Sequence, residues 1–382
     1  NIITMKKFNI FTYLILLVML IASSCKSQET SSSKDETIRL FAGKYTEAAE
    51  KGLYLFDLNR EAGIFKLVST CDAGPNPTYF CISKEKGLIY AANEVDEFNN
   101  TRGGGLTTLK YDSLKGGAEK VNELVVPNGG PCFISLSADE KFLFMANYGG
   151  GSVAVIKLGS DGIPESVTDT IVYKGDEGTR SHAHMIGTNP SGDKVYVTDL
   201  GLDRVTAYNL DITSGRLQEI PDGIATLPKG TGPRHFEFNS EGTKMYVADE
   251  LNSTITVFNV DPSGKLTSVQ TVSTLTDGFS DKNYPGDIHI GKSGSFLYCS
   301  NRGINDIITF KIEPDGLLSL AGHSTCGGVW PRNFVIDPSG KFIVVANQRS
   351  GNISVFPIDE KTGIPAETGK DYALTTPACL KF

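Results

Sequence analysis

The stretch Pro331–Asn347, PRNFVIDPSGKFIVVAN, decides the fold because the chain repeats its pattern. A short apolar run is followed by a Ser/Gly/Lys turn, a second apolar run rich in β-branched and aromatic residues, and a final Asn or Asp. Five further copies begin at Pro77, Pro131, Ala183, Pro233 and Pro285. Internal repetition of this length is typical of a β-propeller in which each repeat forms one four-stranded blade.

The final Asn or Asp of each copy measures the repeat. These residues are Asn93, Asn147, Asp199, Asp249, Asn301 and Asn347. They lie about 50 residues apart, which leaves room for four strands of ordinary length and their turns.

Two incomplete copies remain at the ends of the repeated region. Ile38–Tyr45 matches only the second strand of the pattern, and Pro377–Phe382 matches only the first. Joining them predicts a seventh blade whose innermost strand comes from the C-terminus. The ring then closes without exposed sheet edges. We therefore predict an all-β fold over residues 38–382, a seven-bladed β-propeller with four antiparallel strands per blade.

The residues before the repeats have the pattern of an export signal. Met5 is followed by two lysines, by an apolar run that ends at Ala22 and by small residues just before Cys25. This run is too short to span a membrane, and small residues directly before a Cys resemble the signal of a bacterial lipoprotein. We expect an export signal at 1–24, a lipid on Cys25 and a flexible polar tether at 25–37. An ordinary secretory signal with an incidental Cys is the alternative.

Removal of the signal would make Cys25 the first residue, and a lipid on Cys25 would place the protein in the cell envelope. We expect it to be held to a bacterial membrane only by this N-terminal lipid anchor, facing the periplasm or the exterior. The net charge of −8 and the lack of a basic tract argue against nucleic acid as a partner. A small anionic or sugar-derived ligand is the expected partner.

The other cysteines do not indicate a metal site. None of them forms a close-spaced CxxC pair, so a zinc site is unsupported, and their pairing in disulfides stays open. They are Cys71, Cys81, Cys132, Cys299, Cys326 and Cys379.

The repeat also predicts where functional side chains gather. The first two strands of each copy form a hairpin, so the start of one and the end of the other lie side by side, opposite the turn. The blades bring these pairs around one mouth of the central channel. At the start of the first strand the ring reads Thr78, Cys132, His184, Arg234, Gly286, Arg332 and Ala378. One residue past the Asn or Asp it reads Glu94, Tyr148, Leu200, Glu250, Arg302 and Gln348.

Charged and histidine side chains in these two rings are the strongest functional signal of the chain. Burying such groups costs free energy unless they pair with one another or bind a ligand. All histidines except His323 lie in first-strand segments. We expect His184, Arg234 and Glu250 to be functional because they come from adjacent blades and face one mouth.

Several of the singled-out residues have a structural alternative. The repeated Asn and Asp are expected to cap the strand ends through side-chain hydrogen bonds to the backbone. Arg332 could satisfy carbonyl groups at the blade end, and His235 and His289 could be hydrogen-bonded histidines of the core. His182 and His184 could hold a metal ion, although the expected chemistry needs none, and we expect neither a metal nor a cofactor.

Four stretches carry a resemblance to a known family. They are Ser181–Arg204, Gly232–Phe238, Ser300–Arg302 with the preceding Asp287–His289, and Pro331–Phe334 with Ala346–Gln348. They resemble the lactonase family of seven-bladed propellers, which includes bacterial 6-phosphogluconolactonases of the propeller type and fungal carboxy-cis,cis-muconate lactonising enzymes. The resemblance covers the chain after residue 37.

The resemblance implies a catalytic set of His184 (or His182), Arg234 and Glu250. The same residues stand out in the rings. The expected substrate-binding residues are His182, His235, Asp287, His289, Arg302, Arg332, Glu94 and Gln348.

These residue types suit lactone hydrolysis. The reaction needs a base to activate water, a cation to stabilise the oxyanion and an acid for the leaving alkoxide. Arg234, Arg302 and Arg332 suit planar recognition of a carboxylate or phosphate. No GxSxG motif is present, which disfavours an acyl-enzyme route. We expect a carboxylic-ester hydrolase similar to 6-phosphogluconolactonase that opens a sugar-derived lactone at the channel mouth.

Two other functions stay open on the sequence. One is lactone formation by a muconate-type cycloisomerase, and the other is a surface propeller that binds a ligand or glycan without turnover. The export signal also makes a lactone other than the cytoplasmic sugar phosphate an equally good substrate.

Overall fold

The structure is a computed structural model that describes residues 37–47, 50–112 and 116–382. The expected export signal, Cys25 and the tether up to residue 36 lie outside these residues. In the described ranges no helix is long and apolar enough to cross a membrane.

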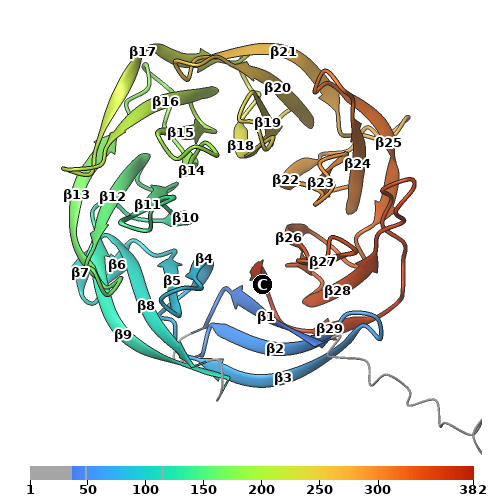
Figure 1. Ribbon diagram of the computed structural model, residues 1–382, viewed down its shortest axis with the longest axis horizontal. Coiled ribbons are helices and arrows are strands. Elements are labelled where there is room, and N and C mark those ends of the chain that lie inside the picture. The colour runs from blue at the N-terminus through green and yellow to red at the C-terminus, as the bar shows by residue number, and fades with distance from the viewer. Residues whose placement is uncertain (1–36, 48–49, 113–115) are drawn as a thin grey trace, which may run out of the picture. The chain divides into compact units, whose positions relative to one another are not determined.

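Residues Ile38–Phe382 form one compact unit, a ring of seven four-stranded antiparallel sheets around a central axis, which we call the channel (Figure 1). The seven-bladed β-propeller predicted from the repeats is therefore confirmed. The blades are numbered here in chain order, and the strands of each blade are given from the channel outward.

Blade 1, which closes the ring, consists of β30 (Pro377–Lys381), β1 (Thr37–Lys44), β2 (Leu53–Asn59) and β3 (Ile64–Cys71). Blade 2 consists of β4 (Pro77–Ser83), β5 (Leu88–Asn93), β8 (Gly104–Asp112) and β9 (Gly117–Val126), with the short hairpin of β6 (Glu97–Phe98) and β7 (Thr101–Arg102) inserted after β5. Blade 3 consists of β10 (Pro131–Leu136), β11 (Phe142–Asn147), β12 (Ser152–Leu158) and β13 (Pro164–Val172). Blade 4 consists of β14 (Ala183–Thr188), β15 (Lys194–Asp199), β16 (Arg204–Asp211) and β17 (Arg216–Thr226).

Blade 5 consists of β18 (Pro233–Phe238), β19 (Lys244–Asp249), β20 (Thr254–Val260) and β21 (Leu266–Ser273). Blade 6 consists of β22 (Tyr284–Ile290), β23 (Phe296–Arg302), β24 (Asp306–Ile312) and β25 (Leu318–Thr325). Blade 7 consists of β26 (Pro331–Ile336), β27 (Phe342–Asn347), β28 (Asn352–Pro357) and β29 (Asp371–Ala373).

The second strand of each blade is buried on both faces because neighbouring blades pack against it. Every residue of β5 and of β11 is buried, whereas nearly all residues of the outermost strands β3 and β13 are half-buried or exposed. A continuous apolar run such as LIYAAN in β5 fits a strand covered on two sides. The apolar runs of the sequence repeat therefore build the contacts between blades.

Buried tyrosines on three of these second strands also tie neighbouring blades together. The hydroxyl groups of Tyr90, Tyr196 and Tyr246 each donate a hydrogen bond to a glycine carbonyl of the next blade. The oxygen–oxygen distances are 2.8, 3.0 and 2.9 Å. Each tyrosine thus buries its ring between blades and satisfies its hydroxyl on the far side.

The repeated Asn holds the link between one blade and the next. Asn93 Nδ2 donates to the carbonyl of Ala73 at 2.7 Å, and Asn347 Nδ2 donates to that of Cys326 at 2.8 Å. Both side chains are fully buried, and their carbonyl partners follow the outermost strand of the preceding blade. These side-chain-to-backbone bonds are of the kind expected from the sequence.

The C-terminal strand closes the ring as predicted. Antiparallel pairing joins β30 to β1, with Leu380 opposite Ala42. Leu380 is fully buried, and its N–H donates to Asn333 Oδ1 of blade 7 at 2.6 Å. One short strand therefore completes the sheet of blade 1 and fastens it to blade 7.

We expect Leu380→Ala to lower the free energy of unfolding by about 2–5 kcal/mol, because it removes a fully buried side chain and leaves a cavity. Leu320→Ala is the matched control, since Leu320 is 60% exposed on the outermost strand of blade 6. It should change stability by no more than about 0.5 kcal/mol. Urea denaturation followed by circular dichroism measures both, and equal effects would contradict the role of the closing strand.

Candidate active site at the channel mouth

A β-bulge lies at the mouth end of the innermost strand in each blade from 2 to 7. In blade 5, Pro233 pairs with Asp249 but the next paired residue is Phe236, so Arg234 falls within the shift of register. Blades 2, 3, 4, 6 and 7 shift register at the equivalent position. A bulge frees a residue from regular pairing and re-aims its side chain. The first ring predicted from the sequence therefore consists of bulge residues.

Glu250 joins two arginines of that mouth in one buried ion-pair cluster. Its Oε2 atom lies 2.8 Å from Arg302 Nη2 and 3.1 Å from Arg234 Nε. Arg234 and Arg302 are almost completely buried. Burial raises the pKa of Glu250, but the two guanidinium groups outweigh this and hold it below its usual value. Glu250 is thus an ionised carboxylate, and we call these residues the Arg–Glu–Arg cluster.

The backbone of β22 fixes the direction of both guanidinium groups. Arg302 donates to the carbonyls of Tyr284 and Pro285 at 3.1 and 3.0 Å, and Arg234 donates to the carbonyl of Gly286. A Cβ atom on Gly286 would lie 2.7 Å from Ser300 Oγ and 3.3 Å from Arg302 Nε. Glycine at this ring position therefore leaves room for the arginines.

A second ion pair lies elsewhere on the mouth. Glu94 Oε2 accepts hydrogen bonds from Thr78 at 2.6 Å and from the Tyr45 hydroxyl at 2.8 Å, and it lies 3.8 Å from Arg332 Nη2. The guanidinium of Arg332 lies over the Tyr45 ring, with 5.4 Å from Cζ to the ring centroid. Arg332 is therefore held by a carboxylate and an aromatic face of neighbouring blades.

Tyr45 is a site residue that the sequence interpretation missed. Lys44 pairs with Pro377 in blade 1 as Asn347 pairs with Pro331 in blade 7. Tyr45 is therefore the seventh member of the second ring. The register was hidden because Lys44 stands in place of the repeated Asn, where its ammonium group contacts Glu50 at 2.6 Å and Thr375 at 2.8 Å.

His184 lies beside these charges as a neutral, buried imidazole. It is 5% exposed and packs edge to face with Tyr148 and His235, at ring-centroid distances of 5.6 and 5.1 Å. Burial, and next the positive charge of Arg234, keep the pKa of His184 well below its usual value. Its ring therefore keeps a free lone pair at neutral pH.

His182 lies half-buried near His184 but has a different environment. Its ring stacks on Tyr148 at 4.3 Å, and its Nδ1 atom lies 3.1 Å from the Tyr148 carbonyl oxygen. Gln348 is also half-buried, at its predicted place one residue past the repeated Asn, where its N–H bonds the Trp330 carbonyl at 3.0 Å. Both residues are thus placed to contact a ligand through side chains that are not locked in an ion pair.

Three other expected site residues lie deeper in the channel than the mouth. Asp287 accepts from His235 Nδ1 at 2.7 Å, and its other oxygen lies 3.2 Å from His289 Nε2. His289 Nδ1 in turn contacts Glu237 at 2.8 Å. The structure therefore brings His235, Asp287 and His289 together with Glu237, which the sequence did not single out, rather than with the Arg–Glu–Arg cluster alone.

This network contains opposite charges, on a buried Asp287 and on a half-buried His289 and Glu237. Burial lowers the pKa of His289, but Asp287 and Glu237 raise it to about 10 overall. Burial also opposes the charge of Asp287, yet His289 and His235 bring its pKa well below the usual value. His289 is therefore a cation held between two carboxylates.

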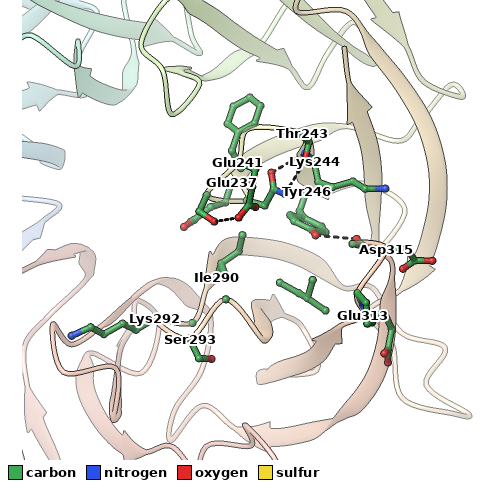
Figure 2. Close-up of a pocket in the computed structure, with 18 residues that line it drawn as sticks. Glu237, Glu241, Thr243, Lys244, Tyr246, Ile290, Lys292, Ser293, Glu313 and Asp315 are labelled. Atoms are coloured by element: carbon green, nitrogen blue, oxygen red, sulfur yellow. Dashed lines mark hydrogen bonds between the residues drawn. The ribbon is translucent and has the colours of Figure 1, made fainter. Parts of the chain in front are cut away.

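A groove lies at the opposite, turn end, between blades 5 and 6 (Figure 2). It has a volume of about 710 Å³ and is lined by Glu237, Lys244, Lys292 and Glu313 among others. Similar grooves of about 560 and 380 Å³ separate blades 4 and 5 and blades 6 and 7. Because a groove of this kind lies between three successive pairs of blades, we attribute it to blade packing rather than to a substrate site.

Metal ligation has no support in the described ranges of the chain. No group of three or more His, Cys, Asp or Glu side chains there is arranged to hold an ion. The six cysteines described are free thiols, and five of them are buried.

A seven-bladed ring with these groups at one mouth is the architecture of a known class. The family described as "Lactonase, 7-bladed beta-propeller" matches residues 39–382, and the chain belongs to this family. It is 29% identical over 348 residues to a 6-phosphogluconolactonase of Bacillus subtilis, covering 90% of this chain and 97% of that protein. It is 31% identical over 335 residues to a 6-phosphogluconolactonase of Formosa agariphila, covering 85% and 93%.

A solved structure supports the same grouping. The periplasmic gluconolactonase of Pseudomonas aeruginosa superimposes with a TM-score of 0.84 at 28% identity, covering 90% of this chain and 98% of that one. The family expected from the sequence motifs is therefore confirmed.

The cationic state of His289 makes a pH-dependent contribution to stability. Because its pKa rises from about 6.5 in the unfolded chain to about 10 in the fold, this contribution is complete below pH 6.5 and is lost as the pH rises through 10. We expect the difference in urea midpoint between the wild type and His289→Gln to be largest near pH 6 and smallest above pH 10. A difference that stays constant over this range would contradict the charged state of His289.

Proposed function

We propose that the protein hydrolyses a sugar-derived lactone at the channel mouth. The observation that carries the proposal is the neutral imidazole of His184 beside the guanidinium groups of the Arg–Glu–Arg cluster. Hydrolysis needs both a proton acceptor for water and a cation for the oxyanion. Membership of the lactonase family and the sugar lactonases among its relatives support the substrate class.

Excess positive charge favours a substrate with an acidic group. Among the described residues, the ion pairs of Arg234, Arg302 and Arg332 are made with two carboxylates, those of Glu94 and Glu250, although the whole chain has a net charge of −8. Burial lowers the pKa of Arg302 to about 10, which still leaves it protonated at neutral pH. Guanidinium groups match carboxylate and phosphate oxygens in pairs. A lactone that carries one of these anions is therefore the best fit.

The contacts suggest separate roles for His184 and Glu250. Glu250 is already engaged in ion pairs with two guanidinium groups, so its role is to orient the arginines. His184 would take a proton from water as the water oxygen bonds to the lactone carbonyl carbon. Arg234 would stabilise the oxyanion. When the ring C–O bond breaks, the alkoxide takes the proton from His184, which leaves a hydroxy acid and a neutral imidazole.

Arg234→Ala and Glu250→Gln should each lower turnover by about 10²–10³, because each disrupts a preorganised charged donor. Gluconolactone and its 6-phosphate, followed by pH-stat, are suitable substrates. Arg216→Ala is the control, since Arg216 is exposed at the start of β17 and should behave as wild type.

Binding can be followed separately from turnover. Trp330 is the single tryptophan, and its ring centroid lies 5.4 Å from Arg302 Cζ, so its fluorescence should report an anion at the cluster. If ligands change the fluorescence but no lactone is turned over, the protein is a propeller that binds a ligand and not an enzyme. Equal rates in wild type, Arg234→Ala and Glu250→Gln would show that the Arg–Glu–Arg cluster takes no part in catalysis.

We also propose that the protein works in the cell envelope, anchored by a lipid on Cys25. The N-terminal sequence pattern supports this location, and so does the periplasmic gluconolactonase among the structural relatives. Expressed with its own N-terminus in a Gram-negative host, the wild type should fractionate with membranes, and Cys25→Ser should be released or left unprocessed. A processed Cys25→Ser protein that stays with the membrane would contradict lipidation.

A further inference from the structure

Behind the candidate base lies a pair of residues that can set its protonation pattern. We propose that Asp287 and His235 are positioning residues that fix the tautomer of His184, so that its Nε2 atom faces the mouth as the proton acceptor. The proposal rests on the function proposed above and adds two residues to it.

Asp287 is surrounded by hydrogen-bond donors. Its side chain is almost completely buried and accepts from His235 Nδ1 at 2.7 Å, from the amide of Asn333 and from the backbone N–H of Ile288 at 3.1 Å. An ionised carboxylate has only acceptors. The contact with His235 therefore requires the ring proton of His235 to be on Nδ1.

His235 then presents a bare nitrogen on its other side. Burial and next the charge of Arg234 hold the pKa of His235 at about 3, so the ring is neutral and carries one proton. With that proton on Nδ1, the Nε2 atom is an acceptor. Nε2 is buried and has no hydrogen-bond partner in the described part of the chain.

Only one neighbouring ring offers a matching free nitrogen. Phe133, Tyr79 and His184 lie around His235 at centroid distances of 5.3, 5.9 and 5.1 Å. Phe133 has no donor, and the Tyr79 hydroxyl, which accepts from Lys381 Nζ at 3.3 Å, makes no hydrogen bond to His235 Nε2. His184 Nδ1 is itself buried and lacks a partner among the described residues.

A hydrogen-bonded link from His184 Nδ1 to His235 Nε2 through one water molecule satisfies both buried atoms. Buried polar atoms without partners are rare, and bridging waters commonly serve such pairs. The proton of the neutral His184 ring is then on Nδ1, and its lone pair is on Nε2. Asp287 thus acts on the mouth through two imidazole rings, in the way that a carboxylate orients a catalytic histidine.

Two substitutions of His235 separate this role from packing. In His235→Asn the side-chain amide takes the place of Nδ1, so the bond to Asp287 is kept but the acceptor for His184 is lost. In His235→Gln the longer side chain can present its amide oxygen near the place of Nε2. His323→Asn is the control, because it makes the same change at a comparable Nδ1–carboxylate contact of 2.6 Å, on the outer strand of blade 6 and far from His184 in the ring.

The tautomer can be read directly by NMR on protein labelled with ¹⁵N-histidine. The chain has five histidines, and the His184 signals can be assigned by their loss in His184→Gln. We expect a protonated Nδ1 and a bare Nε2 on His184 in the wild type and in His323→Asn. His235→Asn should lose this pattern, and His235→Gln should restore it at least in part. A protonated Nε2 in the wild type, or an unchanged pattern in His235→Asn, would overturn the proposal.

Kinetics provide the second readout. With a lactone substrate, kcat should fall about 10²-fold in His235→Asn, at the low end of what a general base contributes, and clearly less in His235→Gln. KM should change little because His235 does not belong to the Arg–Glu–Arg cluster. If the tautomers change as expected but no lactone is turned over, the proposed function is wrong and the inference about the tautomer stands. Turnover lost without a change of tautomer would defeat this inference alone.

Discussion

The ring depends on one constraint, which is that the sheet of blade 1 must be completed by the last strand of the chain. Each blade buries its faces only against its neighbours, so an open ring would expose two apolar faces. The pairing of β30 with β1 removes that exposure. The same strand reaches the candidate site, because the Leu380 N–H bonds Asn333 and Asn333 bonds Asp287. The strand that closes the ring therefore also helps to hold the side chains of Asn333 and Asp287 in place.

Buried arginines at the mouth are tolerated because the fold supplies partners in advance. The bulge at the start of each innermost strand frees a side chain and also leaves backbone carbonyls without regular pairing. Arg234 and Arg302 use carbonyls of Tyr284, Pro285 and Gly286, and Glu250 supplies the opposite charge. The guanidinium groups are thus oriented before any ligand arrives, as catalysis by electrostatic preorganisation requires.

Sequence repetition predicted the blade number, the closing strand and the gathering of Arg234, Glu250 and Arg302, since a strict repeat transfers position from blade to blade. The repeat could not predict how far from the mouth each side chain lies along the channel. His289 lies three residues beyond the Gly286 position, or about 10 Å along a strand, and so it meets Glu237 instead of the mouth. Tyr45 was missed because Lys44 breaks the pattern that marks the register. Pairings across blades, such as Asp287 with His235, depend on geometry that no single repeat contains.

The arginines of the mouth couple ligand charge to the strength of the base. Arg234, Arg332 and Arg302 each lower the pKa of His184, in addition to the effect of burial. An acidic group bound to these guanidinium groups offsets their positive charge, and the pKa of His184 then rises toward the range in which an imidazole accepts a proton efficiently. A neutral lactone leaves the charge in place and meets a weaker base. If the proposed roles hold, discrimination between acidic and neutral lactones appears in kcat as well as in KM, because the arginines proposed to bind the anion also lower the pKa of the imidazole proposed to activate water.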